Sequence, residues 1–122
     1  GSEMCIRDRY IRLVTGRTLP EKAILQHLEE LGLSDSVRLP VSQLSGGMRR
    51  RVAIARAVCC GPELLLLDEA FKGLDEQCRR DTAAYIRRHT AGASVLCVTH
   101  DPEEATLLGG RCIDLAALQR RD

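Results

Sequence analysis

The sequence predicts an α/β fold in which helices pack beside a parallel β-sheet. Four consecutive leucines at residues 64–67 lie between Gly61-Pro62 and a charged segment, which is typical of a strand buried on both faces of a sheet. A second strand is predicted at residues 94–98, and the segment between the two strands has a helical pattern. Strand, helix and strand in this order are typical of a right-handed crossover that leaves both strands parallel.

A first helix is predicted at residues 20–31. Thr18 can cap this helix, Pro20 can occupy its first turn, and Gly32 is placed to end it. Its inner face is expected to be formed by apolar side chains at helical spacing, namely Ile24, Leu28 and Leu31.

A second helix is predicted at residues 46–60, after a loop at residues 32–44. The segment Leu44-Ser45-Gly46-Gly47-Met48 leads into it, and two interpretations of this start remain open. Ser45 can be an ordinary N-cap of a helix with an apolar stripe at Val52, Ala55 and Cys59. Alternatively, the amides of the first turn can hold a phosphate-like anion, because glycines have no Cβ to obstruct its approach.

The second half of the chain contains two further helices. Asp75 is predicted to cap a helix that reaches residue 88. The inner face of that helix is expected to include Cys78, Thr82, Tyr85 and Ile86. Asp101-Pro102 is predicted to begin a short helix that Gly109-Gly110 ends, and residues 112–115 are predicted to form a third strand.

Composition excludes some classes of partner. The chain has 122 residues and a formal net charge of +1, and aromatic residues make up 2% of it. Such a chain has no strong positive field to attract nucleic acid and few rings to stack on bases, so nucleic-acid binding is disfavoured. No apolar run approaches the roughly twenty residues that span a bilayer. Direct membrane insertion is therefore not expected.

The cysteines show no C-x-x-C spacing; they are Cys5, Cys59, Cys60, Cys78, Cys97 and Cys112. They are expected to be small core residues in a reducing cytoplasm rather than disulfide partners or zinc ligands. Residues 1–10 have no periodicity and no apolar region of a signal peptide, and they are interpreted as a non-native or unrelated leader.

Titratable side chains follow both predicted strands. Asp68-Glu69 comes directly after the leucine run, and Val98-Thr99-His100-Asp101 ends the second strand. Ligands of open α/β sheets bind beyond the carboxyl ends of the strands. Asp68, Glu69 and His100 are therefore expected to meet at one edge, where a metal ion and a reacting phosphate would bind.

Four segments together resemble the motifs of ABC-type ATPases, in the family's order and at similar spacing. Residues 44–48 resemble the signature motif, Asp68-Glu69 the Walker B aspartate and catalytic glutamate, residues 73–75 the D-loop, and residues 98–101 the H-loop. The resemblance implies a P-loop NTPase fold of the ABC type, in incomplete form. It begins at about residue 11, with a helical subdomain at residues 11–60 and the Walker B and H-loop half of the ATPase core at residues 61–122.

The resemblance also implies a role for each residue of the sheet edge. Asp68 would hold Mg²⁺, Glu69 would act as general base toward the attacking water, and His100 would contact the γ-phosphate of ATP.

The signature and the D-loop have a different task in that family. Ser45, Gly46 and Gly47 would cover an ATP held by a second ABC subunit in a head-to-tail dimer. Asp75 would cross the same interface and would also cap its helix.

The sequence departs from the family pattern at three places. Met48 stands where glutamine is common, and Ala70 stands where proline is usual. No G-x-x-x-x-G-K-[ST] loop and no Q-loop glutamine occur in the 122 residues. The chain alone is therefore expected to bind ATP weakly or not at all and to hydrolyse none. Without the strand of that loop, the last strand is expected to lie beside an unpaired edge or to pair wrongly, one strand spacing of about 4.8 Å away.

The expected function is that of an ATP-hydrolysing subunit of a bacterial importer of the nitrate, sulfonate or taurine type. It would be cytoplasmic and attached to the inner face of the membrane through transmembrane permease subunits. The alternatives are a soluble ABC ATPase that is not part of a transporter and a non-catalytic fragment.

Other polar residues are interpreted without a catalytic role. His27 and His89 lie on predicted helices with no evident acidic or cysteine partner, so they are expected to be solvated or helix-end histidines rather than ligands. The run Arg49-Arg50-Arg51 is interpreted first as a solvated helix face and second as a nucleotide contact.

Overall fold

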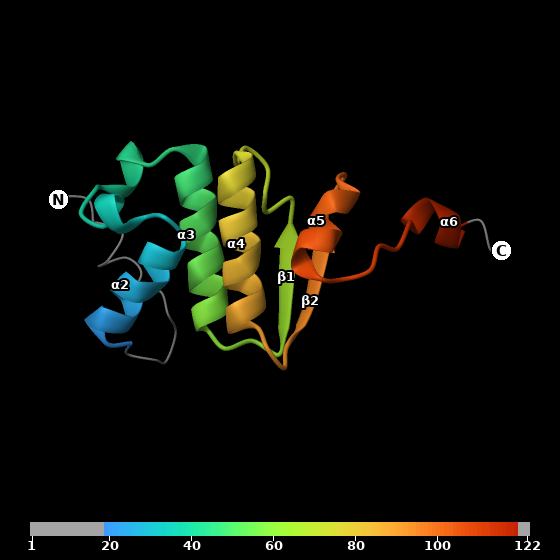
Figure 1. The fold of residues 1–122 in the computed structure, drawn as a ribbon, viewed down its shortest axis with the longest axis horizontal. Helices are drawn as coiled ribbons and strands as arrows, with labels where there is room; N and C mark the ends of the chain where they lie inside the picture. The colour runs from blue at the N-terminus through green and yellow to red at the C-terminus, as the bar shows by residue number, and fades with distance from the viewer. Residues whose placement is uncertain (1–18, 120–122) are drawn as a thin grey trace.

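The computed structural model describes residues 19–119. The expectations for residues 1–10 and for Thr18 lie outside this range. Helices alternate with two strands along the described chain (Figure 1). The elements are α2 (Glu21–Glu30), two 3₁₀ turns η1 (Ser34–Ser36) and η2 (Val41–Gln43), α3 (Gly46–Cys59), β1 (Leu64–Asp68), α4 (Glu76–His89), β2 (Ser94–Val98), α5 (Pro102–Leu108) and α6 (Leu115–Gln119).

Helix α2 begins one residue later than predicted. Pro20 occupies the N-cap position with an extended ψ of 143°, and no side chain caps the helix there. Gly32 follows the helix with a positive φ of 73°, which glycine adopts without a steric penalty, and so ends it as expected. Ile24 and Leu28 are fully buried and Leu31 nearly so. The predicted inner face is confirmed.

Helix α3 buries the predicted stripe. Ala55 is fully buried, and Val52 and Cys59 are each 7% exposed. These side chains share one hydrophobic core with those of α2 and α4, and α3 packs against both helices. The segment between α2 and α3 contains the two 3₁₀ turns where a loop was predicted.

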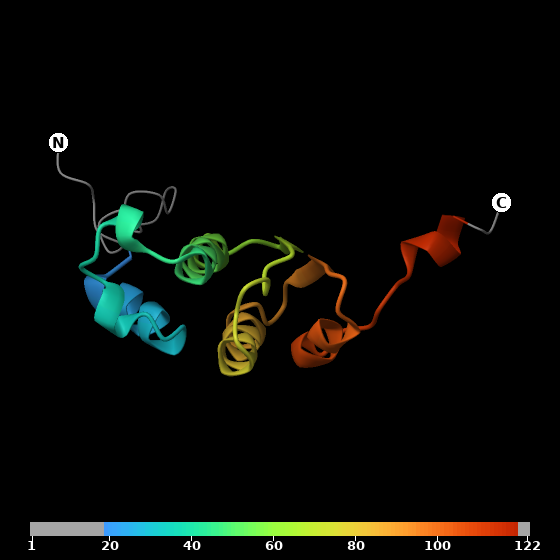
Figure 2. The same cartoon turned by 90° about the horizontal axis from the view of Figure 1, so that it is seen from above.

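The two strands pair in parallel as predicted, with Leu64 opposite Ser94 and Asp68 opposite Val98. Helix α4 makes the crossover between them, and α4 and α5 lie on the same face of the sheet (Figure 2). Leu65 and Leu67 point toward this face and are buried. The parallel crossover brings the carboxyl ends of both strands to one end of the molecule.

The prediction that residues 64–67 are buried on both faces is wrong for this chain. Burial alternates along β1, and Leu64 and Leu66 are 54% and 65% exposed. On β2, Leu96 and Val98 are likewise more than half exposed. Within the described residues, no element covers the face opposite α4 and α5 (Figure 2). The sheet therefore has one packed face and one open apolar face.

The predicted third strand at residues 112–115 does not form. Residues 111–114 have no regular structure, and α6 begins at Leu115. The segment leads away from the sheet, so it neither lies beside an edge nor pairs in a wrong register (Figure 1). Ile113 and Leu115 are 57% and 68% exposed. A lone extended segment cannot pair its backbone N–H and C=O groups, and no strand is close enough to supply partners.

The prediction for the cysteines holds only in part. Among the described residues, Cys59 is buried, Cys78 and Cys97 are partly buried, and Cys60 and Cys112 are exposed. No disulfide joins any of these five. Cys60 and Cys112 are exposed because each follows the end of a regular element instead of lying on its inner face.

The premise that His27 and His89 lack acidic or cysteine partners is wrong. His89 Nε2 lies 2.5 Å from Glu30 Oε2, and Cys59 Sγ lies 3.6 Å from His27 Nδ1. These partners are far apart in sequence, and the packing of α2 against α3 and α4 brings them together.

Candidate functional site

The predicted sheet edge is built around Glu69. Its N–H donates to the Val98 carbonyl with an N–O distance of 2.9 Å, which extends the parallel ladder by one residue beyond β1. Glu69 also has a φ of 52°, and it is the non-glycine residue with positive φ in the described part of the chain. Such a conformation costs on the order of 1–2 kcal/mol for a residue with a Cβ and persists only where the surroundings enforce it.

Glu69 and His100 meet at this edge as predicted. His100 Nε2 lies 3.1 Å from Glu69 Oε1. The His100 side chain is 95% exposed and that of Glu69 is 33% exposed. A pair this open to water adds little stability, about 0–1 kcal/mol, but it holds a carboxylate and an imidazole within proton-transfer distance.

Asp68 lies next to this pair at the end of β1, and its side chain is exposed. Strand alternation places it on the open face together with Leu64 and Leu66. An exposed carboxylate beside a second one supplies the oxygen donors that Mg²⁺ prefers, and the exposure leaves room for the waters that this ion retains. The donor chemistry of Asp68 therefore fits Mg²⁺.

The signature segment forms a capped helix start. Ser45 Oγ accepts a hydrogen bond from the Met48 N–H at 3.1 Å, which confirms the N-cap interpretation. In the part of the chain that the structure describes, the N–H groups of Gly46 and Gly47 have no acceptor. The cap and the anion site are therefore compatible, because the cap uses the third amide of the helix and leaves the first two available.

The two glycines differ in their surroundings. A Cβ placed on Gly46 would have no heavy atom within 4 Å, whereas a Cβ on Gly47 would lie 3.1 Å from Leu74 Cδ2. Gly47 therefore allows the D-loop segment to pack against the start of α3. Sequence reasoning assigned both glycines to anion approach and missed this contact.

Asp75 caps α4 as predicted. Its Oδ1 accepts from the Cys78 N–H at 2.8 Å. This backbone hydrogen bond, aided by the positive charge of Arg51, lowers the pKa of Asp75. The start of α4 lies at the same end of the molecule as the start of α3 and the ends of both strands (Figure 1).

Only part of the arginine run is solvated: Arg49 is exposed, whereas Arg50 and Arg51 are partly buried. Arg50 Nη1 donates to the Glu69 carbonyl at 3.0 Å, and Arg51 Nη1 donates to the Leu31 carbonyl at 2.8 Å. Arg49 makes a longer, exposed bond of 3.4 Å to the Val41 carbonyl. Charged side chains tend to seek water, but a part-buried carbonyl is a competing acceptor. The contact of Arg50 with the Glu69 carbonyl had no signal in the sequence.

A second polar network positions the segment after β2. The Asp101 N–H donates to Thr99 Oγ1 at 3.0 Å, and Thr99 Oγ1 donates to the buried carboxylate of Glu104. Asp101 caps α5 through the Glu103 N–H, and its other oxygen accepts from Arg79 at 2.9 Å. His100 is thereby held between two residues with fixed hydrogen-bond partners. Thr99, Glu104 and Arg79 were not predicted.

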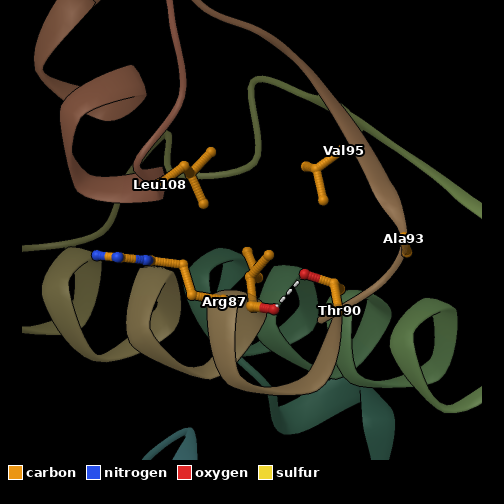
Figure 3. A pocket seen from close by; sticks show the side chains of 6 residues that line it. Arg87, Thr90, Ala93, Val95 and Leu108 are labelled. Carbon is orange, nitrogen blue, oxygen red and sulfur yellow. Dashed lines mark hydrogen bonds between the residues drawn. The ribbon is translucent and has the colours of Figure 1, made fainter.

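A cavity of about 280 Å³ lies at the opposite end of the sheet. It is bounded by the end of α4 on one side and by Val95 and Leu108 on the other, and Thr90 closes it with a hydrogen bond to the Ile86 carbonyl (Figure 3). Its lining is mixed polar and apolar and includes none of the predicted site residues. The candidate site is thus the exposed edge of the sheet and not this cavity.

Comparison with known proteins identifies a family for this chain. The family model described as "ABC transporter" matches residues 6–72. The match begins within the segment 1–10 that the sequence analysis set apart. Within the described residues, no helix is long and apolar enough to cross a membrane.

Several curated relatives are similar over most of this chain. The aliphatic sulfonates import ATP-binding protein SsuB 2 of Agrobacterium fabrum is 50% identical over 70% of this chain and 34% of its own length. The sulfate/thiosulfate import ATP-binding protein CysA 2 of the same organism is 44% identical over 77% of this chain and 27% of its own. The bicarbonate transport ATP-binding protein CmpD of Synechococcus elongatus is 38% identical over 74% of this chain and 33% of its own length.

The chain thus spans about a third of the length of these relatives. The family match covers α3 and β1 and ends just beyond Glu69. The parallel two-stranded sheet with its flanking helices agrees with part of a P-loop NTPase core. On this evidence, the chain belongs to the ABC transporter family of ATP-binding proteins.

Proposed function

We propose that this chain supplies the signature and Walker B parts of the ATP-hydrolysing subunit of an ABC importer. The observation that best supports this is the pairing of Glu69 with His100, 3.1 Å apart, beyond the carboxyl ends of two parallel strands. The free amides at the start of α3 lie at the same end of the molecule (Figure 1).

In this proposal Glu69 is the general base. Its carboxylate accepts a proton from the attacking water, and His100 orients that carboxylate through Oε1. The positive φ of Glu69 and the bond from Arg50 to its carbonyl fix the backbone that presents the carboxylate. A base held in place before substrate binds needs little reorganisation during the reaction.

Asp68 would hold Mg²⁺, through water, on the open face of the sheet. When bound to ATP, the ion neutralises charge on the phosphates. The chain also places these two acidic residues side by side. Asp68 and Glu69 are consecutive, so one peptide bond fixes the distance between their Cα atoms.

The signature segment would act on an ATP held by a second ABC subunit. The N–H groups of Gly46 and Gly47 would donate to its γ-phosphate, and the dipole of the 14-residue helix α3 would favour that negative charge. Leu74 packs against Gly47, so movement of the D-loop that contains Leu74 and Asp75 would be transmitted to the signature. A head-to-tail dimer would use both segments at one interface.

We further propose that the transported substrate is a small anion. The three relatives are named for import of sulfonates, of sulfate and thiosulfate, and for transport of bicarbonate. The subunit would work at the inner face of the membrane, bound to permease subunits through residues 11–60. Residues 61–122 would form part of the ATPase core.

Amide NMR spectra of the 122-residue chain during titration with Mg²⁺-ATP test this function. The expected result is weak binding, with Kd of about 1 mM, shifts concentrated at Ser45, Gly46 and Gly47, and no release of phosphate. The Glu69→Gln variant should show the same shifts, because Glu69 is not part of the signature. Shifts that avoid residues 45–47 would refute the anion role of the signature. Turnover of ATP by the chain alone, lost in Glu69→Gln, would refute the expectation that the isolated chain is inactive.

A further inference from the structure

A cluster of metal-binding side chains lies between α2 and α4, away from the ATPase edge. His27 and Glu30 come from the end of α2, and His89 is the last residue of α4. One ligand atom from each residue lies within 4.8 Å of the others. His27 and Glu30 are three residues apart on one helix, which places them on the same face.

The three side chains are already in contact. His89 Nε2 lies 2.5 Å from Glu30 Oε2. The rings of His27 and His89 are 4.5 Å apart between centroids and are tilted by 35°. Two imidazoles and a carboxylate are a ligand set that Zn²⁺ accepts, with a water in the fourth position. A tetrahedral ion at about 2.0–2.1 Å from each ligand needs ligand atoms about 3.4 Å apart. The ligand atoms of the three residues lie within 4.8 Å of one another, so their widest separation would shorten by at most about 1.4 Å when the ion binds.

Neighbouring groups hold two of the three ligands in place. The Tyr85 hydroxyl lies 2.7 Å from His27 Nδ1, and Tyr85 is only 1% exposed, so it fixes the plane of the His27 ring. Arg88 Nη1 donates to Glu30 Oε1 at 2.7 Å, which leaves Oε2 directed at His89. Hydrogen bonds of this kind orient ligands around metal ions in proteins.

The cluster is accessible to an ion from solvent. The side chains of Glu30 and His89 are 19% and 26% exposed. Arg88 is the nearby positive charge, and its side chain is 59% exposed, so water screens much of its repulsion. The arrangement combines partial burial, which strengthens coordination, with an open path for the ion.

We propose that His27, Glu30 and His89 form a binding site for a transition-metal ion, best matched by Zn²⁺, that joins α2 to α4. The site is independent of the proposed ATPase role and uses none of its residues. Imidazole nitrogen favours Zn²⁺ over the hard ion Mg²⁺. Because α2 lies in residues 11–60 and α4 in residues 61–122, a bound ion would fix the orientation of the helical part relative to the sheet.

Calorimetric titration of the chelator-treated chain with Zn²⁺ tests this site. One ion per chain should bind and raise the melting temperature, and Mg²⁺ at the same concentration should do neither. Glu30→Gln and His89→Gln should each weaken Zn²⁺ binding by at least about 100-fold, and Tyr85→Phe, which removes the hydroxyl that contacts His27, by about 10-fold. Glu29→Gln is the matched control and should bind as the unchanged chain does.

Cobalt spectra separate this site from binding by cysteines. Co²⁺ should give tetrahedral absorption without a thiolate charge-transfer band, and it should broaden the ring signals of His27 and His89. Circular dichroism of each variant confirms that the variant is folded. Unchanged Zn²⁺ binding in folded Glu30→Gln and His89→Gln would overturn the proposal. So would binding that alkylation of the thiols abolishes.

Discussion

The guanidinium of Arg50 is hydrogen-bonded to the backbone carbonyl of Glu69, with Nη1 and O 3.0 Å apart. Arg50 lies on α3, and Glu69, the proposed general base, directly follows β1. The same carbonyl also accepts from the Lys72 N–H at 3.2 Å, so the turn after β1 and the side chain of Arg50 share one acceptor. This one contact joins the helix that follows the signature segment to the acidic pair after β1, two of the four segments that resemble the family.

Replacing Arg50 with alanine should lower the free energy of unfolding by about 1.5–3 kcal/mol, because a charged donor to a part-buried carbonyl is lost. Urea unfolding followed by circular dichroism measures the change. Arg49→Ala is the control and should cost less than about 0.5 kcal/mol, since its bond to Val41 is exposed and 3.4 Å long. Equal losses of unfolding free energy in the two variants would show that the contact with Glu69 stabilises the fold no more than the exposed bond of Arg49 does.

Alanine at Gly47 and at Gly46 should have opposite effects. The new Cβ at Gly47 would lie 3.1 Å from Leu74 Cδ2 and would displace the D-loop, with an expected loss of about 1 kcal/mol. At Gly46 the surroundings are open, so alanine should be neutral or should stabilise by up to about 0.5 kcal/mol. Thermal unfolding of the two variants tests this ordering, and a more stable Gly47→Ala would contradict it.

The open face of the sheet predicts a contrast between neighbouring leucines. Leu65 is 3% exposed, and Leu65→Ala should cost about 2–4 kcal/mol. Leu66 is 65% exposed, and Leu66→Ala should cost less than about 1 kcal/mol. The measurement is urea unfolding of the isolated chain. A large loss from Leu66→Ala would mean that something covers this face in solution, such as a second copy of the chain.

Asp75 should add a pH-dependent contribution to stability. Its pKa is lowered in the folded chain, first by the Cys78 N–H bond and then by the charge of Arg51. The ionised form is therefore favoured by folding, so the stabilisation is present above the ordinary pKa of about 3.9 and is lost as pH falls through the lowered value. Asp75→Asn keeps a capping oxygen without the charge.

The stability difference between Asp75→Asn and the unchanged chain should thus be present at neutral pH and should vanish in acid. Melting curves recorded from neutral pH downward give the comparison. A difference that stays constant into acid would show that the charge of Asp75 does not contribute.

Cys97 should react more slowly with thiol reagents than Cys60. Burial raises the pKa of Cys97, and the negative charges of Glu104, Glu69 and Asp68 raise it further, so less reactive thiolate is present. Cys60 is exposed. Timed alkylation with iodoacetamide and peptide mass analysis should give a rate several-fold lower for Cys97. A faster Cys97 would indicate that β2 opens readily.

Local structure could be predicted from the sequence where a residue acts on its own neighbours. Ser45 and Asp75 cap their helices, and β2 has the predicted bounds, because caps and strand patterns depend on residues within a few positions. The third strand was predicted wrongly for a related reason. Its pattern is local, but a strand also needs a neighbour, and the described chain provides none beside residues 112–115.

The sequence by itself determined the family, the starts of α3, α4 and α5 and the position of the acidic pair after β1, because motif order and short-range chemistry are written in consecutive residues. Only the tertiary structure decided what these residues touch: Arg50 with Glu69, Leu74 with Gly47, and His89 with Glu30. Such contacts join segments up to 59 positions apart. They depend on how whole helices pack against each other and the sheet, and no local pattern of residue types encodes that packing.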